Sequence, residues 1–106
     1  MKRVLLDHCV PRQFGKLLAG HSVSTAAREG WAGLENGELL SAAEDAGFEV
    51  LITSDKNLRY QQNLTQRKIA IIELPTNRLR VVVGHGGEVT QMLAHINPGD
   101  YLIVAS

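Results

Sequence analysis

The chain has 106 residues, of which 44% are hydrophobic and 21% charged, and its formal net charge at pH 7 is zero. These values are ordinary for a globular protein, so we expect a single domain over residues 1–106. The one cysteine, Cys9, excludes an intramolecular disulfide and a cysteine-based zinc cluster. No apolar run approaches the length of a membrane span, and the first residues lead into a strand rather than a signal peptide. We therefore expect a cytoplasmic protein without a membrane partner.

The beginning of the chain predicts a buried strand followed by a helix. Residues 3–7 form a continuous apolar run that ends on an acid, which is typical of a strand buried on both faces. Phe14 and Leu18 then fall at helical spacing and predict a helix over about residues 11–19. Gly20 is expected to end it.

Further strands are expected at residues 21–25, 48–53, 69–74 and 101–105. An apolar stripe predicts a helix over 36–46, with Asn36 as its N-cap. A last helix is expected to begin near Asn77 and to be broken by the three glycines within 84–87. The alternation of strands and helices predicts an α/β fold, a three-layer α/β/α sandwich around a mainly parallel sheet of four to five strands.

Two acids follow two of these buried strands and are the main candidates for chemistry. Asp7 ends the first apolar run, and Asp55 follows the run at 48–53. In an open α/β sheet, ligands bind outside the carboxyl ends of the strands, so both acids are expected at one edge. Converging carboxylates repel each other unless a cation lies between them, which predicts a divalent metal site. The alternative is that one of them is a helix cap or a turn residue.

Glu38 and Asn57 are the next candidates for this site. Glu38 lies in the first turn of the helix expected at 36–46 and would point at the two aspartates if that helix begins over the same edge. A capping role is the alternative for Glu38. Asn57 lies two residues beyond Asp55, and its carbonyl oxygen or a bound water can serve a metal.

The charges are unevenly distributed along the chain. Residues 29–55 hold seven acids and no Lys or Arg, whereas residues 56–80 hold six bases and one acid. Acids that hold cations beside bases that hold phosphates are what metal-dependent phosphodiester chemistry needs, although helices with mixed surface charge give the same pattern. The basic, aromatic and amide groups after Asp55 are also typical of single-strand binding, or of an exposed polar turn. The candidate substrate-binding residues are Lys56, Arg59, Gln61, Gln62, Asn63 and Arg78.

Cys9 offers a different chemistry. A nucleophilic pair with His21, His85 or His95 would give a cysteine-dependent hydrolase. No elbow motif or oxyanion signal accompanies Cys9, and a lone cysteine near a strand end is more often a small buried residue.

Several segments between Val4 and Leu74 occur in a specific order and spacing. They are Leu5-Leu6-Asp7 with Val10-Pro11-Arg12, Gly20-His21-Ser22-Val23, Gly30-Trp31-Ala32-Gly33-Leu34, Asn36-Gly37-Glu38-Leu39-Leu40, Thr53-Ser54-Asp55-Lys56-Asn57-Leu58 and Tyr60-Gln61-Gln62-Asn63-Leu64. Together they resemble the small PIN-like nuclease domains. The resemblance is closest to the short branch often found as the toxin partner of a small DNA-binding antitoxin.

The resemblance implies a parallel sheet whose acids bind Mg²⁺ or Mn²⁺ and cut RNA. By position, the acids carried over are Asp7, Glu38 and Asp55. Two positions depart from the branch, because His8 stands where Glu is frequent and Asn57 where Asp is frequent. Both changes remove negative charge and weaken the expected metal binding.

The expected function is therefore a metal-dependent endoribonuclease, the toxin of a toxin–antitoxin pair. The alternative is a catalytically weak or inactive PIN-like module that binds RNA or a protein partner, which His8 and Asn57 favour. A homodimer is also expected, because PIN-like domains often pair and so small a chain gains buried area by pairing.

Overall fold

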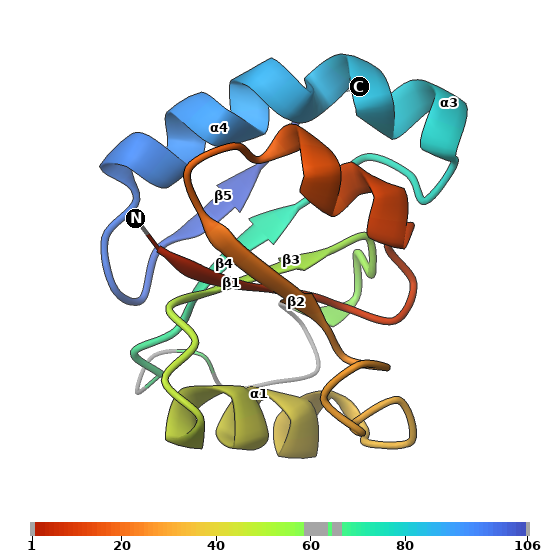
Figure 1. Cartoon of the computed structure of the whole chain (residues 1–106). Helices are drawn as coiled ribbons and strands as arrows, with labels where there is room; N and C mark the ends of the chain where they lie inside the picture. Colours follow the sequence, from red (N-terminus) through yellow and green to blue (C-terminus); the bar gives the residue numbers. More distant parts are fainter. Residues whose placement is uncertain (1, 59–63, 65–66, 106) are drawn as a thin grey trace.

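The centre of the molecule is one parallel sheet. In a computed structural model, which describes residues 2–58, 64 and 67–105, all neighbouring strands are parallel in the order β2-β1-β3-β4-β5 (Figure 1). The strands are β1 (Arg3–Leu6), β2 (Ser22–Thr25), β3 (Val50–Thr53), β4 (Ala70–Glu73) and β5 (Tyr101–Ile103). The α/β class is confirmed, and the sheet is entirely rather than mainly parallel.

The central strands are buried on both faces. Every residue of β3 and β4 is buried, as are the last three residues of β1. A strand covered on both sides cannot alternate between apolar and polar side chains, which explains the continuous apolar runs. β2 lies at one edge of the sheet, and its partly exposed side chains include two serines and a threonine.

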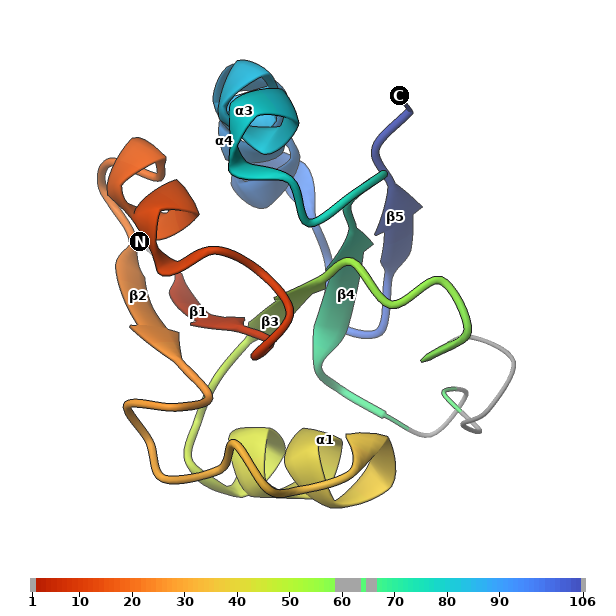
Figure 2. The same cartoon turned by 90° about the vertical axis from the view of Figure 1, so that its right-hand side faces the viewer.

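Helices cover both faces of the sheet and complete three layers. Within the residues that the structure describes, the helices are η1 (Arg12–Leu17), α1 (Asn36–Asp45), α3 (Leu79–Val82), η2 (Val83–His85) and α4 (Gly86–His95), where η denotes a 3₁₀ helix. α1 lies on one face, whereas η1, α3 and α4 lie together on the other (Figures 1 and 2). The expected three-layer arrangement is therefore present.

Each face of the sheet has its own apolar core. Leu6 and Ile52 pack with Phe14 of η1 and Leu93 of α4 on one face. On the opposite face, the intervening strand residues Leu5, Leu51 and Ile71 pack with Leu39, Leu40 and Ala43 of α1. Successive strand residues point to opposite faces, so one short strand supplies both cores.

The helix expected over residues 11–19 is shorter and of a different type. Arg12–Leu17 form a 3₁₀ helix, and Leu18 is its C-cap. Gly15 in its middle disfavours an α-helix. Gly15 also lies so close to β2 that a Cβ atom there would stand 2.9 Å from Val23 Cγ1.

Two expected helix caps are wrong by one residue. Glu35, not Asn36, is the N-cap of α1, because Glu35 and Glu38 form a reciprocal capping box. Arg78, not Asn77, is the N-cap of α3. The expected break at the glycines is confirmed, since the 3₁₀ turn η2 separates α3 from α4.

The sheet order creates a switch point between β1 and β3. The chain leaves β1 through η1 to reach β2 on one side, and it leaves β2 through α1 to reach β3 on the other. The two connections lie on opposite faces, so a crevice opens at the carboxyl ends of β1 and β3. Among the described residues, no helix has the length and apolar character needed to cross a membrane.

Candidate active site

Asp7 occupies the carboxyl end of β1, at the switch point. Its side chain is 2% exposed, and its backbone N–H donates to the carbonyl oxygen of Ile52 (2.9 Å). Oδ1 of Asp7 accepts a hydrogen bond from the backbone N–H of His8 (2.8 Å), and Nδ1 of the His8 ring lies 2.9 Å from the same oxygen. A buried carboxylate requires such partners. The chain itself therefore provides part of the stabilisation that the sequence assigned to a cation.

The hydroxyl of Thr53 links the two predicted aspartates. Oγ1 of Thr53 donates to Oδ2 of Asp7 (2.8 Å) and accepts from the backbone N–H of Asp55 (3.0 Å). Thr53 is fully buried at the end of β3. One hydroxyl therefore fixes both the Asp7 carboxylate and the start of the loop that carries Asp55. Thr53 is not among the site residues predicted from the sequence, although a threonine that ends an apolar run directly before an acidic loop is an available signal.

Asp55 is half-buried and held by two neighbours. Its Oδ2 accepts from Nδ2 of Asn36 (3.1 Å), and its Oδ1 accepts from the backbone N–H of Asn57 (2.9 Å). The second bond is an Asx turn, so the turn role weighed for Asp55 is present. Asn36 was expected only as a helix cap, whereas its amide orients Asp55. Asn57 has an exposed side chain and contacts Asp55 through its backbone.

Glu38 has a capping role in α1 and lies on the wall of a cleft. Its Oε1 accepts from the backbone N–H of Glu35 (3.4 Å), as one half of the capping box. The side chain is exposed. Because this hydrogen bond is long and solvent-accessible, the carboxylate can turn away from the cap at little cost.

A cleft of about 590 Å³ lies at the first turn of α1. Its lining residues are His8, Ala32, Leu34, Glu35, Asn36, Gly37, Glu38 and Asp55. The structure thus brings Glu38 and Asp55 to one cleft and places Asp7 beside it, behind His8 and Thr53. Within the described ranges, no three His, Cys, Asp or Glu side chains are grouped as a ready metal site.

The cleft has the chemistry that a hard cation needs. Carboxylates of Glu35, Glu38 and Asp55 line it, although that of Glu35 is engaged in the capping box, and their negative charge attracts cations. Carboxylate oxygens are the ligands that Mg²⁺ and Mn²⁺ take. Glu38 is exposed and only its Oε1 accepts a hydrogen bond, whereas both oxygens of Asp7 and both oxygens of the half-buried Asp55 already have hydrogen-bonding partners.

Two hydroxyl groups lie next to the partly exposed Cys9. Its thiol sulfur accepts from Oγ of Ser54 (3.2 Å) and lies 3.8 Å from Oγ1 of Thr53. Nδ1 of His21 accepts instead from the backbone N–H of Lys2, and Nδ1 of His85 lies 3.4 Å from Glu88. No histidine among the described residues pairs with Cys9.

The predicted substrate-binding residues are only partly described. Lys56 is exposed on the loop directly after Asp55, and Arg78 is exposed at the start of α3. The other four, Arg59, Gln61, Gln62 and Asn63, lie outside the described residues.

Comparison with known proteins identifies no similar protein. No protein-family model matches the chain, and no curated protein and no solved structure is significantly similar to it.

Proposed function

We propose that the chain is a metal-dependent endoribonuclease of the PIN-like kind, using Mg²⁺ or Mn²⁺. The observation that carries the proposal is the link from Asp7 through Thr53 to Asp55 at the β1/β3 switch point, beside the cleft lined by Glu38. Ligand sites of open parallel sheets form at such points. The reaction class comes from the resemblance of the sequence to PIN-like domains.

The proposal assigns distinct roles to the residues of the cleft. Asp7, Glu38 and Asp55 would hold the cation, with Asn57 as a weaker helper. When bound, the cation lowers the pKa of a water molecule and offsets the charge that develops on the phosphate. Thr53 orients the Asp7 carboxylate, and the Asn36 amide orients Asp55.

Phosphate groups next to the cleavage site need positively charged side chains of the protein to bind them. Lys56 directly follows Asp55 and is exposed, so its ammonium group can reach a flanking phosphate. The proposal adds the toxin role, a small antitoxin as partner, a homodimer and a cytoplasmic location, all of which follow from the resemblance and the composition.

A second candidate is a PIN-like module that binds RNA or a protein partner without cutting. Nδ1 of His8 lies 2.9 Å from Oδ1 of Asp7, so the imidazole occupies a position that a metal ligand or cation would need. Asn57 offers an amide where a carboxylate would bind a cation more strongly.

Cleavage of single-stranded RNA with and without Mn²⁺ tests the proposal. We expect Asp7→Asn and Asp55→Asn to lower the Mn²⁺-dependent rate by about 10²-fold or more, because each removes a ligand charge. Asp45→Asn, which changes an exposed acid at the far end of α1, serves as the control and keeps the parental rate. His8→Glu is expected to raise the rate. Mn²⁺ should also raise the melting temperature of the parent more than that of Asp55→Asn.

Three outcomes contradict the proposal. RNA binding by the parent without any cleavage favours the binding module. Cleavage that persists in EDTA and disappears in Cys9→Ala indicates a cysteine-dependent hydrolase. Equal cleavage rates for the parent and Asp7→Asn would show that the proposed acids take no part in the reaction.

A further inference from the structure

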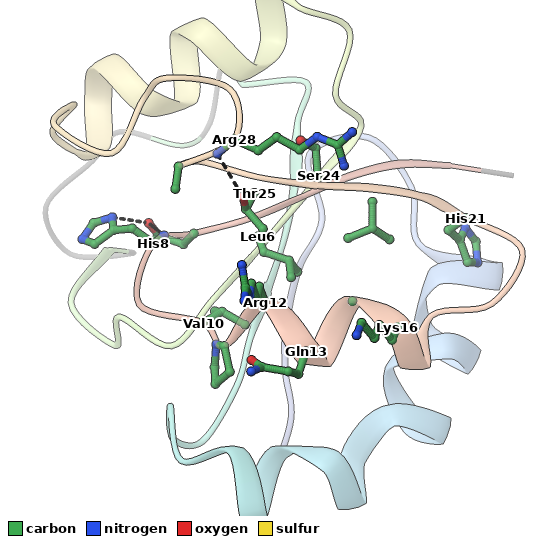
Figure 3. Close-up of a pocket in the computed structure, with 15 residues that line it drawn as sticks. Leu6, His8, Val10, Arg12, Gln13, Lys16, His21, Ser24, Thr25 and Arg28 are labelled. Carbon is green, nitrogen blue, oxygen red and sulfur yellow. Dashed lines mark hydrogen bonds and ion pairs between the residues drawn. The ribbon is translucent and has the colours of Figure 1, made fainter.

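A second groove lies on the other side of Asp7, between η1 and β2. Its volume is about 1160 Å³. Figure 3 shows Arg12, Gln13 and Lys16 extending from η1, with Ser24, Thr25 and Arg28 on the opposite wall and His21 at one end. We call this the η1–β2 groove.

The cations of the η1–β2 groove are free to bind a ligand. Arg12, Lys16 and Arg28 are all exposed. Within the part of the chain that the structure describes, none of the three side chains pairs with a carboxylate, whereas Arg67 is paired with Glu44 at 2.8 Å. Three unpaired cations along one groove make a strongly positive surface.

Acids near these three cations are few. Residues 1–28 contain five Lys or Arg and a single acid, Asp7. Asp7 is the only acid among the groove-lining residues, and its carboxylate is buried and engaged by Thr53 and His8. The next acid, Glu29, is exposed and accepts a hydrogen bond from the hydroxyl of Ser24 on the β2 wall (2.6 Å), so one negative charge at this wall offsets part of the positive charge.

The groove and the acidic cleft meet at the carboxyl end of β1. His8 lines both of them, and Asp7 lines the groove next to His8. A chain of phosphates lying over Arg12 and Lys16 would therefore continue directly to the cleft that holds Glu38 and Asp55. A polyanion that lies in the groove and places one phosphate in the cleft would gain binding free energy from both sites.

We propose that the η1–β2 groove binds the sugar-phosphate backbone of single-stranded RNA and leads it into the acidic cleft. This inference rests on the proposed nuclease function for the choice of RNA. The groove supplies what single strands require, because cations track the backbone while the rings of His8 and His21 and the amide of Gln13 can meet bases. It also differs from the basic segment after Asp55 that the sequence singled out.

Binding of a fluorescent single-stranded oligoribonucleotide in EDTA tests the groove separately from cleavage. Arg12→Gln/Lys16→Gln is compared with Lys2→Gln/Lys68→Gln, which removes the same charge near the amino ends of the strands. Each phosphate contact to a single strand contributes about 0.7 to the slope of log affinity against log salt. We expect the groove variant to lower that slope by about 1.4 and the control to keep the parental slope. Arg12→Lys/Lys16→Arg is expected to restore binding.

Each other result has a definite meaning. Any of three results contradicts RNA binding by the groove. The groove variant binds RNA as tightly as the parent, the control variant loses as much affinity as the groove variant, or the parent binds no RNA at low salt. Duplex DNA bound as tightly, with the same dependence on Arg12 and Lys16, overturns the choice of single-stranded RNA. RNA binding that depends on the groove, without Mn²⁺-dependent cleavage, contradicts the proposed nuclease activity and supports RNA binding by the groove. Mn²⁺-dependent cleavage together with an RNA affinity that the groove variant does not change contradicts the proposed role of the groove and supports the nuclease.

Discussion

Individual hydrogen bonds hold the acids of this site in place. Asp7 depends on Thr53 and His8, and Asp55 depends on Asn36 and on the backbone of Asn57. Of the two partners of Asp7, Thr53 comes from β3, whereas His8 directly follows Asp7 in the chain. Substitutions that remove one hydrogen-bonding group at these contacts therefore separate the effect of an acid's orientation from the effect of its charge.

Replacing Thr53 by Val removes the hydroxyl and keeps the branched shape. The change leaves Oδ2 of the buried Asp7 and the N–H of Asp55 without their partner. We expect a loss of about 1–3 kcal/mol in the free energy of unfolding, measured with urea. Thr53→Ser retains the hydroxyl and serves as the control. A Thr53→Val protein as stable as the parent would show that the hydroxyl bonds contribute nothing.

Glu44 makes a comparable set of contacts away from the site. Its carboxylate accepts from Nη1 of Arg67 (2.8 Å) and from the backbone N–H groups of Lys68 (2.8 Å) and Ile69 (3.4 Å). Burial raises the pKa of Glu44, but the hydrogen bonds and the charge of Arg67 outweigh burial and hold the pKa below its ordinary value. Because the folded state favours the ionised form, its stabilising effect is complete above the ordinary pKa and is lost as the pH falls through the lowered one.

Glu44→Gln should therefore destabilise the protein in a pH-dependent way. We expect a loss of about 1 kcal/mol at pH 7, which shrinks below about pH 4 as the parental carboxyl is protonated. Urea unfolding at pH 7 and at pH 3.5 measures the difference. Asp45→Asn, at the adjacent exposed acid, should show a smaller effect at both values. A constant difference for Glu44→Gln across this range would contradict the assignment.

Among the elements, η1 decides the shape of the basic groove. It is a short 3₁₀ helix that approaches β2 closely at Gly15. Phe14 anchors η1 in the core, while Arg12 and Lys16 remain exposed beside the groove. The groove therefore depends on how closely this helix packs against the edge strand.

Gly15→Ala tests that close approach. The added Cβ would stand 2.9 Å from Val23 Cγ1 and 3.4 Å from Leu6 Cδ1, so either the branched Val23 side chain or η1 must shift. We expect a loss of about 1–3 kcal/mol, seen as a lower melting temperature. Gly84→Ala is a matched control, because Gly84 also lies in a 3₁₀ helix but has no atom within 4 Å of its added Cβ. That control should be neutral or stabilising by up to about 1 kcal/mol, and a Gly15→Ala protein as stable as Gly84→Ala would contradict the packing argument.

At the scale of the whole molecule, the strand order joins two surfaces of opposite charge. β1 and β3 are neighbours, and the connection from β1 to β2 through η1 lies on the opposite face of the sheet from the connection from β2 to β3 through α1. The acidic cleft forms beside α1, and the basic groove forms beside η1. Asp7 and His8 lie where the two surfaces meet. Net charge of zero for the whole chain conceals this separation.

The sequence by itself determined the α/β class, the order of the strands along the chain, and Asp7 and Asp55 as residues at strand ends. These properties follow from local patterns, because apolar runs, helical spacing and glycine breaks act over a few neighbouring residues. Even there, the cap of α1 was wrong, since Glu35 and Asn36 are both competent caps and only the completed capping box selects one.

The tertiary structure alone decided the sheet order, the link through Thr53, the amide of Asn36 on Asp55, and the η1–β2 groove. Thr53 and Asp7 are 46 residues apart, and Asn36 and Asp55 are 19 apart. Contacts between distant segments depend on which strands become neighbours and on which face each connection crosses. That choice minimises exposed apolar surface over the whole chain, so no local stretch of sequence encodes it.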